Sequence, residues 1–115
     1  MTQNKALSML GLAMKAGKIA SGEYQVLEAV RAGTAWCVLV AEDASDNTRK
    51  LYTDKCTYYE VPVFVYGTKE ELGRTIGKDL RSAVAVCDEG LSKAVVAAIT
   101  KASTERSNGG KHGEN

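Results

Sequence analysis

Hydrophobic positions in this chain follow two alternating patterns, helical spacing and short unbroken apolar runs. Helical spacing predicts helices at about residues 4–15, 21–32, 46–59, 68–76 and 88–102. The apolar runs predict strands at residues 36–41, 61–66 and 83–87, with residues 18–21 as a short extended link. An unbroken run such as 36–41 is typical of a strand covered on both faces, so we expect it to be central. The alternation predicts an α/β sandwich with helices on both faces of a small sheet.

Residues 68–78 carry the clearest local signals in the chain. Thr68 with Glu71 three residues later forms a capping box, which predicts that a helix begins at Thr68. Gly77 supplies the left-handed conformation that ends a helix without a Cβ penalty. Residues 78–82 then make a short charged loop before a buried strand. Loops on a rigid scaffold commonly carry function, so this loop is well placed to contact a ligand.

Other polar residues are predicted to fix helix ends. Ser21 is expected to cap the second helix and Asp88 the last one. Glu42 and Asp43 resemble a pair of catalytic acids, but no histidine, third carboxylate or nucleophile lies nearby in the sequence. We therefore expect Glu42 and Asp43 to cap the third helix and fix its loop.

Composition indicates one ordinary globular domain. The chain has 115 residues, of which 44% are hydrophobic and 25% charged, so one core is expected, in residues 1–103. Residues 104–115 are polar and rich in glycine, and we expect them to form a disordered tail. No apolar run approaches the roughly 20 residues that cross a bilayer, and the N-terminus lacks a cleavage pattern. These features predict a cytoplasmic protein without membrane contact.

The reactive residue types are sparse and scattered. Cys37, Cys56 and Cys87 are odd in number and far apart, which supports neither a disulfide framework nor a zinc site. The single histidine, His112, lies in the tail. Residues 17–22 have half the spacing of a phosphate loop, but Glu23 stands where the phosphate-binding lysine is required. We expect no enzyme, metal, cofactor or small-molecule substrate.

Charge points to a local basic surface in a nearly neutral protein. The net charge is +1, so the overall electrostatic field does not by itself indicate nucleic-acid binding. Several cations lie in or beside the connections that flank strands: Lys15, Lys18, Lys69, Arg74, Lys78 and Arg81. If residues 17–22, 42–46 and 77–82 converge, these cations form a positive edge suited to a nucleic-acid backbone. Otherwise they are solvated surface charges. Tyr52, Tyr58 and Tyr59 are candidates for a stacking platform. Aromatic residues on such a helix more often occupy core and rim positions, and that is what we predict for them.

Four ordered motifs bear a family likeness. They are S-G-E at 21–23, V-L-V-A-E-D-A-S at 38–45, D-K-C at 54–56 before V-P-V at 61–63, and L-G-R-T-I-G-K at 72–78. Together they resemble the ribosomal L7Ae, L30e and Gadd45 family, and within it the short bacterial YlxQ branch, over about residues 4–102. The resemblance implies a three-layer α-β-α sandwich with a small mixed four-stranded sheet. It also implies RNA binding, which many members direct at kink-turns.

The kink-turn motif of that family is Gly-x-Asn-Glu-x-x-Lys, and it corresponds here to residues 22–28. Gly22 is retained, whereas Tyr24 replaces the asparagine, Gln25 the glutamate and Glu28 the lysine. Tyr24 lacks an amide that donates and accepts at once, and Glu28 reverses a charge facing RNA. The resemblance therefore implies RNA contact in general, with kink-turn specificity in doubt.

The sequence thus predicts a non-catalytic protein that binds structured RNA and acts with the ribosome or the translation machinery. Ribosomal RNA and ribosomal or translation proteins are the candidate partners. The alternative is a protein-interaction module that keeps the fold without RNA binding. The resemblance implies these RNA-binding residues: Lys18, Ser21, Gly22, Glu23, Tyr24, Gln25, Glu28, Ser45, Lys69, Lys78, Asp79, Leu80, Arg81 and Ser82.

Overall fold

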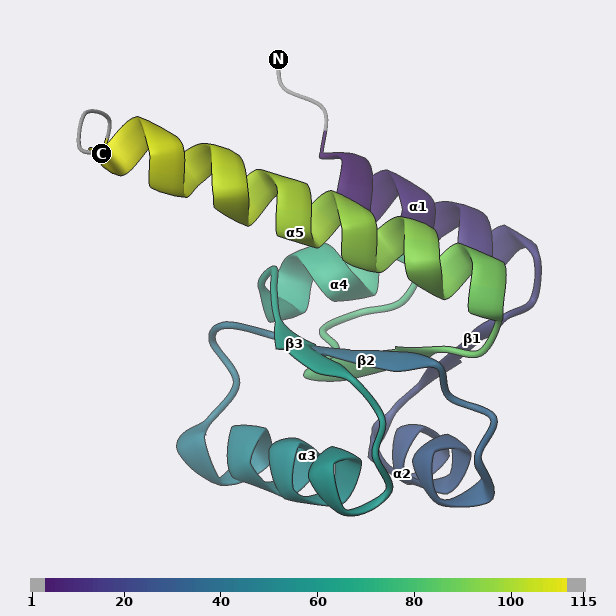
Figure 1. The fold of residues 1–115 in the computed structure, drawn as a ribbon. Coiled ribbons are helices and arrows are strands. Elements are labelled where there is room, and N and C mark those ends of the chain that lie inside the picture. Colours follow the sequence, from purple (N-terminus) through teal and green to yellow (C-terminus); the bar gives the residue numbers. More distant parts are fainter. Residues whose placement is uncertain (1–3, 112–115) are drawn as a thin grey trace.

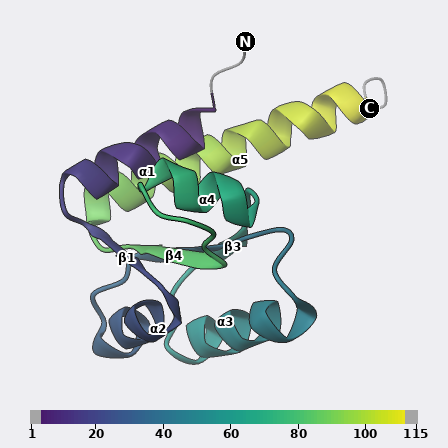
Figure 2. The same cartoon turned by 180° about the vertical axis from the view of Figure 1, so that it is seen from behind.

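Two helical layers enclose one small sheet in a computed structural model that describes residues 4–111 (Figures 1 and 2). Helices α1, α4 and α5 cover one face of the sheet, and α2 and α3 cover the other. The elements, in chain order, are α1 (Lys5–Lys15), β1 (Ile19–Ser21), α2 (Glu23–Ala32), β2 (Cys37–Val40), α3 (Asp46–Tyr58), β3 (Val63–Val65), α4 (Lys69–Thr75), β4 (Ala83–Val86) and α5 (Glu89–Lys111). The predicted three-layer α-β-α sandwich is confirmed.

The sheet is mixed and has the order β1-β4-β2-β3. Strand β4 pairs antiparallel with both β1 and β2, whereas β2 and β3 are parallel. The predicted link at residues 18–21 forms the edge strand β1. Strand β2 lies inside the sheet, as the unbroken apolar run at 36–41 predicted. Strand β3 forms the opposite edge, where its entry through Pro62 does not remove a needed ladder hydrogen bond.

The hydrophobic core lies on both faces of the two inner strands. Every residue of β2 and β4 is buried, because helices pack on both sides of them. Leu10 of α1, Val26 of α2 and Leu72 of α4 are fully buried against this sheet. Burying each such aliphatic side chain contributes about 1.5–3 kcal/mol, so the core holds the loops at the strand ends in place.

Short polar side chains begin most of the helices. The Thr68 hydroxyl accepts from the Glu71 amide and the Glu71 carboxylate accepts from the Thr68 amide, so the predicted capping box is confirmed. Asp88 accepts from the Leu91 amide at 2.9 Å, as predicted for the last helix. The prediction for Ser21 was wrong, because Ser21 belongs to β1 and Gly22 occupies the cap position of α2.

The prediction that Glu42 and Asp43 cap the third helix was also wrong. Ser45 performs that role, since its Oγ accepts from the Thr48 amide at 3.1 Å. Asp43 instead accepts from the backbone amide of Lys69, the first residue of α4. A carboxylate stabilises the positive end of any helix. The chain path brings Asp43 to the start of α4 rather than to the start of α3, which is nearer in the sequence.

Helix α5 is longer than the hydrophobic pattern predicted. It continues to Lys111, whereas the sequence predicted an ordered domain ending at residue 103. Residues 104–106, Thr-Glu-Arg, include good helix formers and no glycine, so the backbone can continue the helix there. The domain boundary at residue 103 stays a prediction, and the expectations for residues 112–115, including His112, lie outside the described residues.

Candidate nucleic-acid interface

Four chain segments meet at one end of the sheet. Strand β1 ends there at Ser21, and the register pairs Ser21 with Val84 near the start of β4. The amide of Ala41, just after β2, donates to the carbonyl of Ser82 at 2.8 Å. The amide of Glu42 donates to the carbonyl of Gly67, which precedes α4. Backbone hydrogen bonds therefore join the end of β2 to Ser82 and to Gly67, and strand pairing brings Ser21 to the same end of the sheet.

Arg81 links the start of α2 to α4. Its backbone amide donates to the carbonyl of Lys69 at 3.1 Å, and its Nε donates to the Oγ of Ser21 at 3.5 Å. Its Nη1 also donates to the carbonyl of Leu80 at 2.9 Å. These contacts fix the guanidinium between β1 and α4. We call the surface made by Ser21, Gly22, Asp43, Lys69, Arg81 and Ser82 the sheet-end surface.

The loop after α4 rests directly on that helix at Gly73. Gly73 is buried, and a Cβ built at this position would overlap the carbonyl oxygen of Asp79. The amide of Lys78 donates to the Gly73 carbonyl at 2.8 Å. Lys78 and Leu80 are exposed, and Leu80 keeps 59% of its surface accessible. A small residue in α4 thus sets the position of the loop that carries the cations.

The start of α2 presents unpaired backbone amides. Gly22 has φ +90° and no side chain, so the helix has no side-chain cap. Val26 makes the first backbone bond of this turn, to the carbonyl of Gly22. In the described part of the chain the amides of Glu23, Tyr24 and Gln25 have no acceptor. Free amides at a helix start attract anions such as phosphate.

Cations without acidic partners surround this end of the sheet. Within residues 4–101, whose side chains are described, no ion pair includes Lys69, Lys78 or Arg81. Arg74 is different, because its Nη1 lies 3.3 Å from Glu70 Oε2. The Asp43 carboxylate lies near the Lys69 backbone and offsets part of the positive charge. The local charge remains positive in a protein of net charge +1.

Three predicted residues lie apart from the sheet-end surface. Lys18 is exposed at the opposite end of β1, where its carbonyl accepts from the Cys87 amide. It lies three positions before Ser21, roughly 10 Å along a strand. Ser45 is near Asp43 in the chain, but its hydroxyl is occupied by the cap of α3. Lys15 ends α1 and also lies outside this surface.

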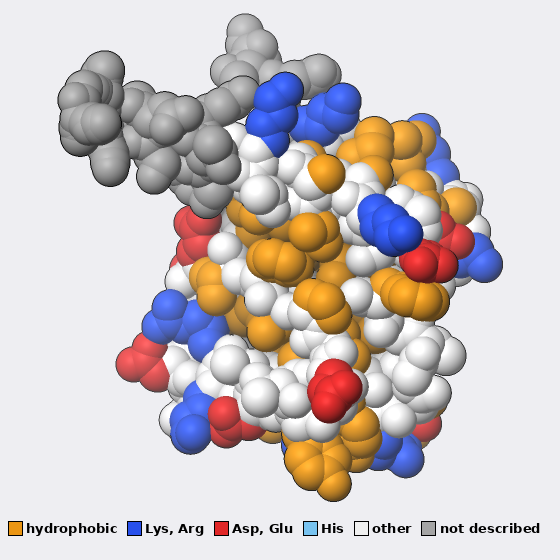
Figure 3. Space-filling view, viewed as in Figure 1, with side chains coloured by type: hydrophobic (Ala, Val, Ile, Leu, Met, Phe, Trp, Pro, Cys, Tyr) orange, Lys and Arg blue, Asp and Glu red, His pale blue; other side chains and the backbone are white. Residues whose placement is uncertain are grey.

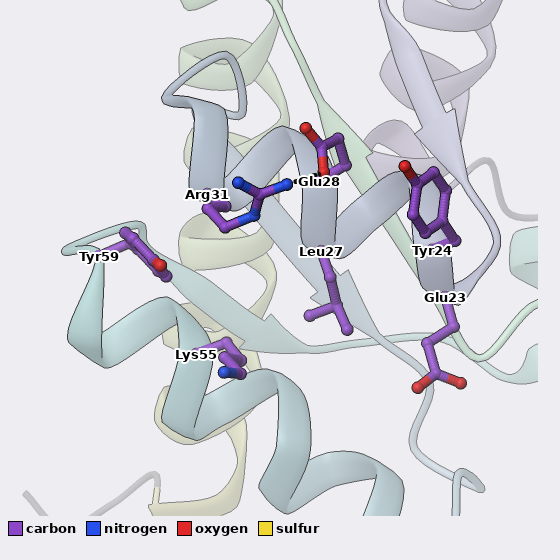
Figure 4. A pocket seen from close by; sticks show the side chains of 7 residues that line it. All are labelled: Glu23, Tyr24, Leu27, Glu28, Arg31, Lys55 and Tyr59. Carbon is purple, nitrogen blue, oxygen red and sulfur yellow. Dashed lines mark hydrogen bonds and ion pairs between the residues drawn. The ribbon is translucent and has the colours of Figure 1, made fainter.

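Other predicted residues of α2 border a groove between α2 and α3 (Figure 4). Glu23, Tyr24 and Glu28 line it from α2. Glu28 pairs with Arg31 one turn later, so its charge is compensated on its own helix. The sequence reasoning missed Arg31 as the partner of Glu28, although their spacing of three residues is a signal of an ion pair on a helix.

Burial suppresses the ionisation of several groups near the groove and the sheet. It raises the pKa of Tyr52 to about 12, with a smaller contribution from the negative charge of Glu23. It also raises the pKa of the Cys56 thiol to about 11. The pKa values of Cys37 and Cys87 are raised mainly by burial as well. A thiol with a raised pKa is a weak nucleophile, so these cysteines behave as core residues.

The described residues contain no cluster of three or more histidine, cysteine or acidic side chains that could hold a metal ion. None of the described helices is long and apolar enough to cross a membrane.

The fold and the sheet-end surface define a small α-β-α sandwich domain with a loop-built basic surface at one end of its sheet. The model of the ribosomal protein L7Ae/L30e/S12e/Gadd45 family matches residues 4–96, and the chain belongs to this family. The family predicted from the four motifs is therefore confirmed.

Individual relatives agree with this membership. The chain is 45% identical to the RNA-binding protein YlxQ of Bacillus subtilis strain 168 over 91 residues, 79% of this chain and 91% of that protein. It is 36% identical to the large ribosomal subunit protein eL30 of Aeropyrum pernix over 99 residues, 81% of this chain and 92% of the relative. A solved structure of a Bacillus halodurans C protein, 42% identical, superimposes with a TM-score of 0.82 and covers 85% of this chain and 99% of its own.

Proposed function

We propose that this protein binds structured RNA without catalysis, through the sheet-end surface, as a cytoplasmic partner of the ribosome or the translation machinery. One observation carries the proposal. Arg81 contacts both Ser21, before the start of α2, and Lys69, at the start of α4. Unpaired helix amides and uncompensated cations therefore lie on the same surface, which suits the phosphates of a folded nucleic acid. The relatives named for RNA binding and for the large ribosomal subunit support the same class of ligand.

Each part of the surface has a distinct physical role in this proposal. Lys69 and Arg81 of this surface, with Lys78 in the adjoining loop, neutralise phosphates and release counterions. Gly22 lets the RNA backbone approach the amides of α2 closely, because it has no side chain. These contacts recognise the shape and charge of the RNA rather than its base sequence.

Kink-turn recognition in the usual family manner is not part of the proposal. The positions that correspond to the reading motif hold Tyr24, Gln25 and Glu28, and Glu28 is paired with Arg31. A double variant, Glu28→Lys with Tyr24→Asn, tests this point. It should bind a standard kink-turn more tightly than the natural protein does, while both bind a non-kinked structured RNA similarly. Tight kink-turn binding by the natural protein would contradict the assignment.

The central experiment measures binding of a structured RNA at two or more salt concentrations. The affinity should fall as salt rises, and Lys69→Ala should lower the salt slope by about one. Lys93→Ala is the matched control, because Lys93 lies on α5 and pairs with Glu89 at 3.4 Å. It should leave the slope unchanged. Absence of any binding to structured RNA at low salt would refute the proposed function.

A second candidate, a protein-interaction module, is favoured by a separate apolar surface. Hydrophobic side chains gather over β3 and α5 on the face shown in Figure 3. A hollow of about 440 Å³ there is lined by residues that include Trp36, Pro62 and Phe64, and Trp36 is 47% exposed. A protein partner that survives nuclease treatment and is lost with Trp36→Ala, but kept with Lys69→Ala, would support this candidate.

A further inference from the structure

The groove between α2 and α3 has a volume of about 540 Å³ and is open to solvent. That volume is within the range of pockets that hold small organic groups. Leu27 lies between the two helices and points toward α3, where Lys55 faces it (Figure 4). Tyr24 lies at one end of the groove and Tyr59 at the other. The groove therefore has one aliphatic side chain, Leu27, between the helices and a tyrosine at each end.

The two tyrosines are available for stacking. Tyr24 is 78% exposed on the first turn of α2, and no hydrogen bond of the described residues uses its hydroxyl. Tyr59 is held in place by an edge contact with Tyr58, whose ring centroid lies 4.8 Å away at 82°. Tyr59 keeps 36% of its surface accessible beside this contact, so part of the ring can meet a flat group. Every nucleobase has a π-face, so exposed aromatic rings bind unpaired bases with little regard to sequence.

Acidic and basic side chains are equal in number in the groove, and one pair of them forms an ion pair. Arg31 pairs with Glu28 on α2, and Lys55 takes part in no ion pair within the described side chains. Two acidic and two basic side chains line the groove, so it lacks the net positive charge of the sheet-end surface. Lys55 can neutralise one phosphate while the ring faces hold the bases.

The groove begins where the sheet-end surface ends. Tyr24 is two residues after Gly22, and it also lines the groove. An RNA backbone that contacts the amides at the start of α2 therefore has a direct path past Tyr24 toward Lys55 and Tyr59. The path follows one face of α2 for about two turns.

We propose that the α2–α3 groove binds an unpaired, single-stranded segment that leaves the structured RNA at the start of α2. Tyr24 and Tyr59 stack on its bases, and Lys55 contacts a phosphate between them. This inference rests on the proposed function, because the sheet-end surface must first hold the structured part of the RNA.

The test compares a structured RNA with the same RNA carrying a single-stranded overhang of several adenosines. The overhang should raise the affinity of the natural protein about tenfold, in keeping with stacking on aromatic rings. Tyr24→Ala and Tyr59→Ala should each remove most of that gain. Tyr24→Phe should retain it, because phenylalanine keeps the ring face. Lys55→Ala should reduce the gain, whereas Lys50→Ala, on the same helix but outside the groove, should not.

The outcomes separate this inference from the proposed function. If the natural protein binds the RNA equally well with and without the overhang, the inference is refuted and the proposed function stands. A gain from the overhang that persists in Tyr24→Ala and Tyr59→Ala also refutes the inference, because the overhang then binds elsewhere. If neither RNA binds at low salt, both proposals are refuted. Circular dichroism and urea unfolding of each variant check that it is folded, so that a smaller effect of the overhang on affinity does not reflect unfolding.

Discussion

The Oδ1 atom of Asp43 accepts a hydrogen bond from the backbone amide of Lys69 at 2.8 Å. This contact joins the loop after the central strand β2 to the first residue of α4, 26 positions later in the chain. It satisfies one of the amides that the start of α4 leaves unpaired. It also places a negative charge on a surface whose other ionic groups are cations, so Asp43 affects both stability and RNA affinity.

Asp43→Asn separates these two effects. The asparagine oxygen still accepts from the Lys69 amide, so the free energy of unfolding should change by only a few tenths of a kcal/mol. Loss of the negative charge should raise the affinity for structured RNA at low salt and steepen the salt slope. Asp43→Ala also removes the acceptor and should cost about 1 kcal/mol. Urea unfolding and RNA titration measure both quantities, and weaker RNA binding by Asp43→Asn would contradict the prediction.

Gly73→Ala should displace the loop that carries Lys78 and Arg81. A Cβ at residue 73 would overlap the Asp79 carbonyl, so we expect a loss of about 2 kcal/mol or more in the free energy of unfolding. RNA affinity should fall as well. Gly11→Ala in α1 is the matched control, because its Cβ would meet Cγ2 of Thr75, the last residue of α4, at an ordinary distance of 3.7 Å. That variant should be stabilised by about 0.5–1 kcal/mol. Equal stability of the two variants would show that the loop does not depend on Gly73.

Stability should fall at alkaline pH. Burial raises the pKa of Cys56 from 9.0 to about 11 and that of Tyr52 from 10.0 to about 12. The unfolded chain therefore releases these protons first, and the folded state loses relative stability as the pH rises from about 9 toward 12. Tyr52→Phe should flatten the upper part of this decline. Urea midpoints at a series of alkaline pH values check the slope, and an unchanged slope in Tyr52→Phe would exclude the tyrosine as a source.

Lys18→Ala and Lys69→Ala should differ in their effect on RNA binding. Lys69 lies on the sheet-end surface, whereas Lys18 lies at the opposite end of β1. On a short structured RNA, Lys69→Ala should lower the salt slope by about one and Lys18→Ala by clearly less. Titrations of both variants at the same salt concentrations provide the comparison. Equal slopes would mean that the RNA wraps around the edge strand.

The sequence by itself determined the order of the elements, the family and the capping box at Thr68 and Glu71. The element order and the capping box depend on local periodicity and on contacts only a few residues apart, so one sequence is enough to predict them. The family was indicated by the resemblance of four short motifs. The same local reasoning failed at Ser21 and at Asp43. A side chain at a helix start is a plausible cap in any sequence, and the chain path decides which helix it reaches.

The tertiary structure alone decided which side chains share a surface. The sheet register places Ser21 beside Arg81, which lies 60 residues later, and separates Lys18 from both. Packing of α2 against α3 brings Tyr24 and Tyr59 to the two ends of one groove. No local pattern encodes such pairs, because they arise only when strands pair and helices bury their apolar faces on the same sheet.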